Sequence, residues 1–190
     1  MAPLGEADET LMARTAEGDR ACLELLVRRH ATPLLTFLAR MSGDRHRAEE
    51  LFQEVFLAVW VKRRLYQYPR PFKPWLYAIA MNKFRATFRA RAAPSAQLTA
   101  ESFADAGESP ADAVIAAETA DLVGRAVARL PEQQRAVVTL RVWEGLPYAR
   151  IAEIVACSEA TVRSHMHHGL AALRKQLEPM LAQIHGERGA

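Results

Sequence analysis

A run of basic residues in the middle of the chain has the composition of a polyanion-binding surface. No acidic residue stands between Glu54 and Glu101, and nine cations fill that gap: Lys62, Arg63, Arg64, Arg70, Lys73, Lys83, Arg85, Arg89 and Arg91. A solvated helix face usually mixes charges of both signs, so a one-sign run of this length indicates a polyanionic partner. Nucleic acid is the first candidate and an anionic membrane surface is the second.

Aromatic residues accompany these cations. Tyr66 and Tyr68 lie in a short stretch broken by prolines, with Gln67 between them. Aromatic rings stack on unpaired bases, and a glutamine amide offers both a donor and an acceptor to a base edge. We therefore expect these three residues to meet bases. The remaining cationic and polar contacts would come from Arg70, Asn82, Lys83, Arg85 and Arg89. Four other aromatic residues are assigned to the core: Phe72, Trp75, Tyr77 and Phe88.

Residues 148–177 predict a helix-turn-helix. The first helix ends at a tight turn over residues 156–158, and the Ser158 hydroxyl can cap the second helix. A seam of Ile151, Val155, Val162, Met166, Leu170, Leu173 and Leu177 would face inward. The outer face of the second helix is short, polar and cationic, as entry into a major groove requires. It presents Ala160, Ser164, His167, His168 and Lys175, with Arg163 at its margin.

The helix expected at residues 47–64 is apolar on two sides. Ala48, Leu51 and Val55 lie on one face with the spacing of an ordinary core stripe. The opposite side carries Glu49, Glu50, Gln53 and Glu54, and it also carries Leu57 and Val61. Such a patch fits a docking surface for a basic partner helix, and it equally fits a helix buried on both sides.

Other chemistries have weaker support. His165, His167 and His168 cluster near one another, but no acid or thiol completes a zinc ligand set nearby, although Cys157 could approach in space. No nucleophile with a matching base, phosphate loop or carboxylate pair stands out, so we expect neither catalysis nor a cofactor. Two distant cysteines and no apolar run of about 20 residues favour a cytoplasmic protein without membrane insertion.

These residues must be positioned by helices, because every periodic segment has helical spacing and none alternates like a strand. We expect helices at 10–17, 20–30, 33–41, 47–64, 74–91, 116–130, 132–144, 148–156 and 159–180. Residues 93–113 are acidic and rich in Ala, Ser, Pro and Gly, which is typical of a linker. The sequence therefore predicts an all-α protein with two small helical domains, residues 1–92 and 116–190, joined by a flexible linker at 93–115.

The order and spacing of these blocks resemble the extracytoplasmic-function (ECF) group of the sigma-70 family of RNA polymerase sigma factors. Residues 48–56 are similar to the family's region 2.2, and residues 72–82 to regions 2.3 and 2.4. Residues 130–135 and 144–152 resemble regions 4.1 and 4.2. Residues 161–164 resemble the start of the helix that reads the −35 promoter element. The resemblance implies a region 2 helical bundle followed by a region 4 helix-turn-helix.

The resemblance also implies partners and roles. Glu50, Gln53 and Glu54, with Leu57 beside them, would bind the β′ clamp helices of core RNA polymerase, and the C-terminal domain would meet the β flap. The basic and aromatic tract would bind and melt the −10 promoter element. The −35 element would be read by Ser158, Thr161, Arg163, Ser164, His167, His168 and Lys175. Family members are commonly held inactive by an anti-sigma protein.

The sequence thus predicts an ECF sigma factor that is not an enzyme and that directs transcription initiation at specific promoters. The alternative is a helix-turn-helix regulator of the response-regulator output type, which would act without docking on polymerase. Such a regulator has no need of the acidic surface at residues 50–54. Met81, His165 and His168 stand where the family commonly has arginine, and neutral imidazoles would make fewer contacts with guanine or phosphate.

Overall fold

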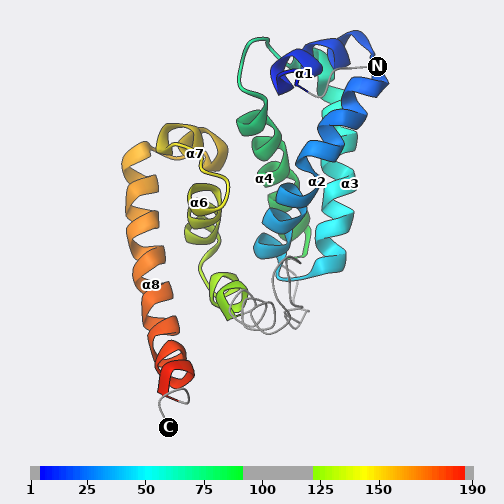
Figure 1. Cartoon of the computed structure of the whole chain (residues 1–190). Helices are drawn as coiled ribbons and strands as arrows, with labels where there is room; N and C mark the ends of the chain where they lie inside the picture. The colour runs from blue at the N-terminus through cyan, green and yellow to red at the C-terminus, as the bar shows by residue number, and fades with distance from the viewer. Residues whose placement is uncertain (1–4, 92–121, 187–190) are drawn as a thin grey trace.

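The computed structural model describes residues 5–91 and 122–186, and these residues are helical with no strand among them (Figure 1). The linker expected at 93–115 lies outside the described residues. The N-terminal part contains α1 (Asp8–Glu17), α2 (Arg20–Ser42), α3 (Arg45–Lys62), the short 3-10 helix η1 (Arg63–Leu65) and α4 (Phe72–Arg91). The C-terminal part contains a helical segment at 122–128, followed by α6 (Glu132–Val142), α7 (Tyr148–Val155) and α8 (Glu159–Gly186).

Local sequence signals set the boundaries of α1, α2 and α3. Gly18 ends α1 in the left-handed conformation, with a φ of 107°, which a glycine adopts without steric cost. The Asp19 carboxylate then accepts hydrogen bonds from the N–H groups of Ala21 and Cys22, at 3.0 and 3.2 Å. Asp44 caps α3 in the same way by accepting from the N–H of Arg47 at 3.0 Å. The predicted break between the first two helices is confirmed.

Pro33 does not begin a helix, and this corrects the sequence-based expectation. Helix α2 runs without interruption from Arg20 to Ser42, with Pro33 inside it. A proline within a helix loses one backbone hydrogen bond and costs roughly 3 kcal/mol. The side chains of Leu26, Leu34 and Phe37 on this helix are fully buried. Each such burial contributes about 1.5–3 kcal/mol, which offsets the cost of the proline.

The N-terminal core forms where α2, α3 and α4 lie side by side (Figure 1). The rings of Phe37 on α2 and Tyr77 on α4 meet edge to face at 5.0 Å, and Leu51 of α3 is buried beside them. Helix α1 covers one end of this bundle, where it contacts η1 and α4. It therefore lies next to the loop that connects these two elements.

The C-terminal part contains the expected helix-turn-helix. Ala156 ends α7 with a left-handed φ of 59°, and the Ser158 hydroxyl accepts a hydrogen bond from the N–H of Thr161 at 3.1 Å. Ile151, Val155, Val162 and Met166 are buried in the seam between α7 and α8. The turn, the cap and these four seam residues are confirmed.

Leu170 was expected in the same seam, but its side chain is 46% exposed. Gly169 takes the inward position instead, because an added Cβ there would lie 2.8 Å from Cγ2 of Val138 on α6. Steps of four residues turn 400° around a helix, so two such steps from Val162 drift about 80° from the starting face. Gly169 is only about 20° off that face. Its lack of a side chain lets α8 approach α6 closely.

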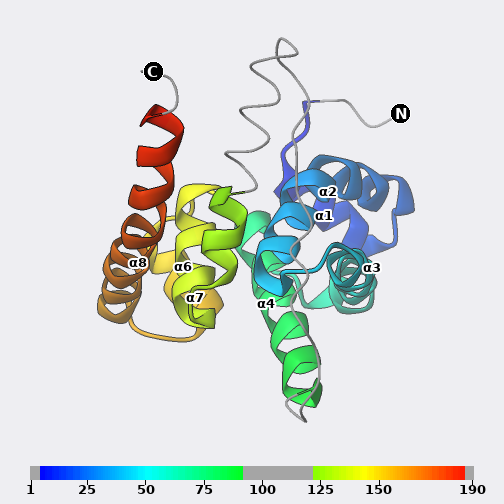
Figure 2. The ribbon, with the colours of Figure 1, turned by 90° about the horizontal axis from the view of Figure 1, so that it is seen from below.

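The two parts are in contact: α7 packs on α4, and α6 packs on α2. Figure 2 shows the C-terminal helices on one side of α2 and α4, with α3 on the other. One Arg135 guanidinium N–H reaches across to the carbonyl oxygen of Met41 at 2.6 Å. None of the helices in the described segments is long and apolar enough to cross a bilayer.

Candidate functional site

Helix α3 presents an exposed surface that is part acidic and part apolar, here called the α3 face. It consists of Glu50, Gln53, Glu54, Leu57 and Val61, all exposed, while the opposite side of α3 is buried in the bundle. Glu50 pairs with Arg47, and Glu54 accepts from Lys83 of α4 at 3.3 Å. Because Leu57 and Val61 remain open to solvent, α3 is not buried on both sides. An apolar strip flanked by carboxylates is suited to a basic, partly apolar partner.

The loop that follows η1, here called the aromatic loop (residues 66–71), contains one buried and one exposed tyrosine. Tyr66 is only 7% exposed, and its hydroxyl donates a hydrogen bond to the carbonyl oxygen of Arg70. Its ring packs edge to face against Trp75 at 5.3 Å. Tyr68 is 62% exposed. Burial among aromatic rings makes Tyr66 part of the core, which corrects the expectation that its ring meets a base. Tyr68 remains a candidate for base contact.

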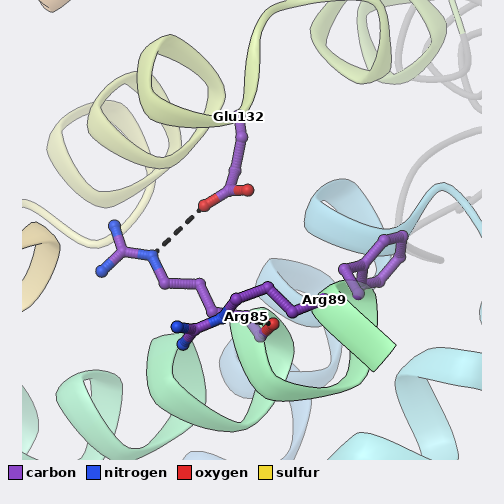
Figure 3. Close-up of a pocket in the computed structure, with 4 residues that line it drawn as sticks. Arg85, Arg89 and Glu132 are labelled. Carbon is purple, nitrogen blue, oxygen red and sulfur yellow. Dashed lines mark hydrogen bonds and ion pairs between the residues drawn. The ribbon is translucent and has the colours of Figure 1, made fainter. Parts of the chain in front are cut away.

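Two of the four cations expected to bind the −10 element, Arg70 and Arg85, are engaged by the C-terminal part of the chain. Arg85 has a side chain only 17% exposed, and its guanidinium binds Glu132 at 3.2 Å and the carbonyl oxygen of Val155 at 3.0 Å. Figure 3 shows this ion pair bridging a hollow between α4 and α6, with Arg89 beside it. Arg70 of the aromatic loop pairs with Glu153 of α7 at 3.4 Å. Asn82 and Arg89 remain exposed on α4.

A buried carboxylate forms the centre of this contact. The side chain of Glu144, just after α6, is 3% exposed and lies 3.1 Å from Nζ of Lys73 at the start of α4. The same ammonium group donates to the backbone oxygen of Glu144 at 2.8 Å. Burial, and then the negative charge of Glu144, raise the pKa of Tyr77. Arg40 of α2 covers the ring of Trp143 at 4.0 Å. The two parts are thus joined through a carboxylate that water reaches poorly.

The outer face of α8 contrasts with this covered surface. Ser158, Thr161, Arg163, Ser164, His167, His168 and Lys175 are all exposed. Arg163 pairs with Glu159 one turn earlier and lies over the ring of Tyr148 at 5.3 Å. These partners belong to α7 and α8 themselves, so this face needs no rearrangement of the chain before it can meet DNA. A polar, cationic helix face of this kind suits the major groove.

The described residues contain no preformed metal-binding site. Across residues 5–91 and 122–186, no three His, Cys, Asp or Glu side chains are grouped as metal ligands. The rings of His167 and His168 meet edge to face at 5.6 Å on the exposed side of α8. Cys157 is half-buried and Cys22 is buried.

The chain matches known proteins in both parts. A family profile for Sigma-70 region 2 matches residues 26–93, and one for Sigma-70, region 4 matches residues 120–173. Over 188 residues the chain is 32% identical to the RNA polymerase sigma-H factor of Pseudomonas aeruginosa, covering 94% of this chain and 97% of that one. Over 186 residues it is 30% identical to the ECF RNA polymerase sigma-E factor of Escherichia coli K12, covering 92% and 96%. The chain belongs to the sigma-70 family, in its ECF group.

This sigma factor binds core RNA polymerase and directs promoter-specific transcription initiation. A solved structure of the sigma factor RpoE in complex with the anti-sigma factor NepR from Bartonella quintana has the same fold. It matches with a TM-score of 0.70 at 21% identity, covering 82% of this chain and 96% of that one. The alternative of a regulator that acts without polymerase is not favoured, because the similarity extends through the N-terminal part.

Sequence reasoning missed the contacts that tie distant segments of the sigma factor together. Lys73 and Glu144 lie 71 residues apart in the sequence, Arg70 and Glu153 lie 83 apart, and Glu9 and Phe72 lie 63 apart. Charged residues at such separations have no local periodic signal that would pair them. The sequence identified a run of cations but did not indicate their partners within the chain.

Proposed function

We propose that this ECF sigma factor uses three binding surfaces. Two lie on a polymerase-docking and −10 domain (residues 1–92), and the third lies on a −35 domain (residues 116–190). A linker (residues 93–115) joins the two domains. The α3 face binds the β′ clamp helices of core polymerase. The aromatic loop captures an unpaired base of the −10 element. The outer face of α8 reads the −35 element, while the C-terminal domain meets the β flap. The factor itself contributes binding and no catalysis.

The observation that carries the −10 assignment is the exposed ring of Tyr68 beside the buried ring of Tyr66. Strand opening requires that the factor bind the single-stranded form more tightly than the duplex. An exposed aromatic ring on a loop stiffened by Pro69 and Pro71 stacks on a base at a small entropic cost. Gln67 and Arg70, also exposed on this loop, can contact the base edge and a neighbouring phosphate.

Tyr68→Ala tests this assignment. Loss of one base stack removes roughly 1–3 kcal/mol, so the variant should form holoenzyme and closed complex normally but open the promoter about tenfold less well. Permanganate reactivity of thymines in the −10 region measures the opening directly. Tyr66→Ala is the comparison variant, and it should instead lower the thermal stability of the protein. Reactivity of the wild-type level in Tyr68→Ala would contradict base capture by this ring.

The distance between the promoter elements requires the two parts of the factor to separate. The −10 and −35 elements are centred about 25 base pairs apart, or about 85 Å along B-DNA. Arg70 of the aromatic loop lies 3.4 Å from Glu153, which is six residues before Glu159, the first residue of α8. Six residues span at most about 22 Å, so the start of α8 lies within about 30 Å of Arg70. The arrangement in which the two parts are in contact, here called the closed arrangement, cannot contact both elements at once.

An anti-sigma partner is the regulator that fits this arrangement best. The Bartonella quintana relative was solved in complex with an anti-sigma factor. In the present chain the cations Arg70, Lys73 and Arg85 are engaged by the C-terminal part, so a protein that stabilised this contact would withhold them from DNA. Adding such a partner should lower the affinity of the factor for promoter DNA, as a competition binding assay would measure.

A further inference from the structure

Helix α1 lies before the residues matched by the region 2 profile, which begin at residue 26, yet it contacts the aromatic loop at both ends. The first residue of α4, Phe72, donates its backbone N–H to Oε1 of Glu9 on α1 at 3.0 Å. The first N–H groups of a helix have no acceptor within the helix itself. Here a carboxylate 63 positions earlier in the sequence supplies the acceptor, and its negative charge also suits the positive end of the helix dipole.

The neighbouring carboxylate holds α1 in place. Asp8 accepts from Arg29 at 2.8 Å, and its other oxygen lies 2.7 Å from Nε2 of His30, both on α2. His30 is itself buried, and its ring meets the ring of Phe72 edge to face at 5.3 Å. Asp8 therefore fixes α1 on α2, and Glu9, the next residue, is held in position to reach the start of α4.

The other end of the aromatic loop lies in the same environment. The pKa of Tyr66 is raised to about 12, mainly by burial and then by the nearby charges of Glu9 and Asp8. The Tyr66 hydroxyl closes the loop by donating to the carbonyl oxygen of Arg70. The exposed residues Gln67, Tyr68 and Arg70 thus lie between two anchors, Tyr66 and Phe72, and both anchors lie close to Glu9.

We propose that Glu9 is a positioning residue for promoter opening: its hydrogen bond to the Phe72 N–H holds the aromatic loop in the shape that presents Tyr68 to an unpaired base. The inference rests on base capture by the aromatic loop, as proposed above. Glu9 touches no DNA. It acts by holding the loop in its binding shape before the base arrives, so less conformational entropy is lost on capture.

The test compares Glu9→Ala with Glu9→Gln, in which the amide oxygen can still accept from the Phe72 N–H. Glu17→Ala, an exposed acid at the other end of α1, is the matched control. In holoenzyme, Glu9→Ala should bind a single-stranded −10 oligonucleotide and open promoters about tenfold less well, which corresponds to about 1.4 kcal/mol. Glu9→Gln and Glu17→Ala should stay within about twofold of wild type. Affinities for core polymerase and for duplex −35 DNA should be unchanged in all three.

A direct structural readout accompanies the functional one. Hydrogen exchange of the Phe72 amide in the free full-length factor should accelerate in Glu9→Ala and remain slow in Glu9→Gln. Equal loss of opening in the alanine and glutamine variants would overturn the hydrogen bond as the cause. Normal opening by Glu9→Ala, with a defect in Tyr68→Ala, would overturn the role of Glu9 and leave base capture intact. The reverse result, a defect in Glu9→Ala with normal opening by Tyr68→Ala, would overturn capture by Tyr68 and with it the proposed role of Glu9.

Discussion

The two surfaces proposed to bind DNA differ in how much of each is engaged by the rest of the chain. The outer face of α8 is exposed, and the partners of its Arg163 lie on α7 and α8 themselves. The basic surface of α4 and the aromatic loop is engaged across the molecule by Glu132, Glu144 and Glu153 of the C-terminal part. The outer face of α8 is therefore open, whereas Lys73 and Arg85 on the second surface become available only when the two parts separate.

The comparison also separates two kinds of ion pair. Lys73 and Glu144 meet where the carboxylate is 3% exposed, while Arg70 and Glu153 are both about half exposed. Removing one partner of a buried pair leaves the other charge poorly solvated, which is strongly destabilising. Removing one partner of an exposed pair changes little, because water and salt screen both charges. We therefore expect Glu144 to contribute most to closure.

The largest effect is expected from Glu144→Ala. Lys73 and Arg40 would both lose the negative charge of the buried carboxylate, at a cost of roughly 2–3 kcal/mol to the contact after allowing for the partial exposure of Lys73. The two parts should separate, and small-angle X-ray scattering should record a larger radius of gyration. Glu178→Ala, which removes only an exposed partner of Arg174, is the control. An unchanged radius of gyration would mean that packing of α7 on α4 is sufficient for closure.

The next effect concerns the surface that is already open. Arg163 lies near the start of α8, where a recognition helix reaches base edges, so Arg163→Ala should lose roughly 1–3 kcal/mol on the preferred −35 sequence. Lys175→Ala, further along the helix, should weaken all sequences alike. Binding to specific and scrambled −35 duplexes would measure both variants. Equal losses on the two duplexes for Arg163→Ala would limit Arg163 to backbone contacts.

The smallest effect is expected from Glu153→Gln. Its ion pair with Arg70 is exposed, so closure should weaken by less than about 1 kcal/mol and the radius of gyration should stay close to that of wild type. Arg70 would nevertheless be released, and binding to a single-stranded −10 oligonucleotide should rise slightly. Separation as large as that caused by Glu144→Ala would remove the distinction between buried and exposed pairs.

Much of this protein could be predicted from local patterns. Most of the helices, the Asp19 and Ser158 caps and most of the seam of the helix-turn-helix follow from the periodicity or chemistry of neighbouring residues. Each depends on residues a few positions apart, whose relative placement the helix geometry already defines. The family was also recognisable from the order of these blocks.

Tertiary structure decided what those patterns left open. In the folded chain Tyr66 is buried and Tyr68 is exposed. Leu170 faces solvent and Gly169 faces α6, and helix α2 continues through Pro33. It also paired Arg85, Lys73 and the Phe72 N–H with acids far away in the sequence. A helical pattern reports which face of a segment is apolar, but it does not report which other segment covers that face. Ion pairs and hydrogen bonds across the fold depend on that packing, so the sequence alone predicted candidate DNA-binding residues without showing which of them are already engaged.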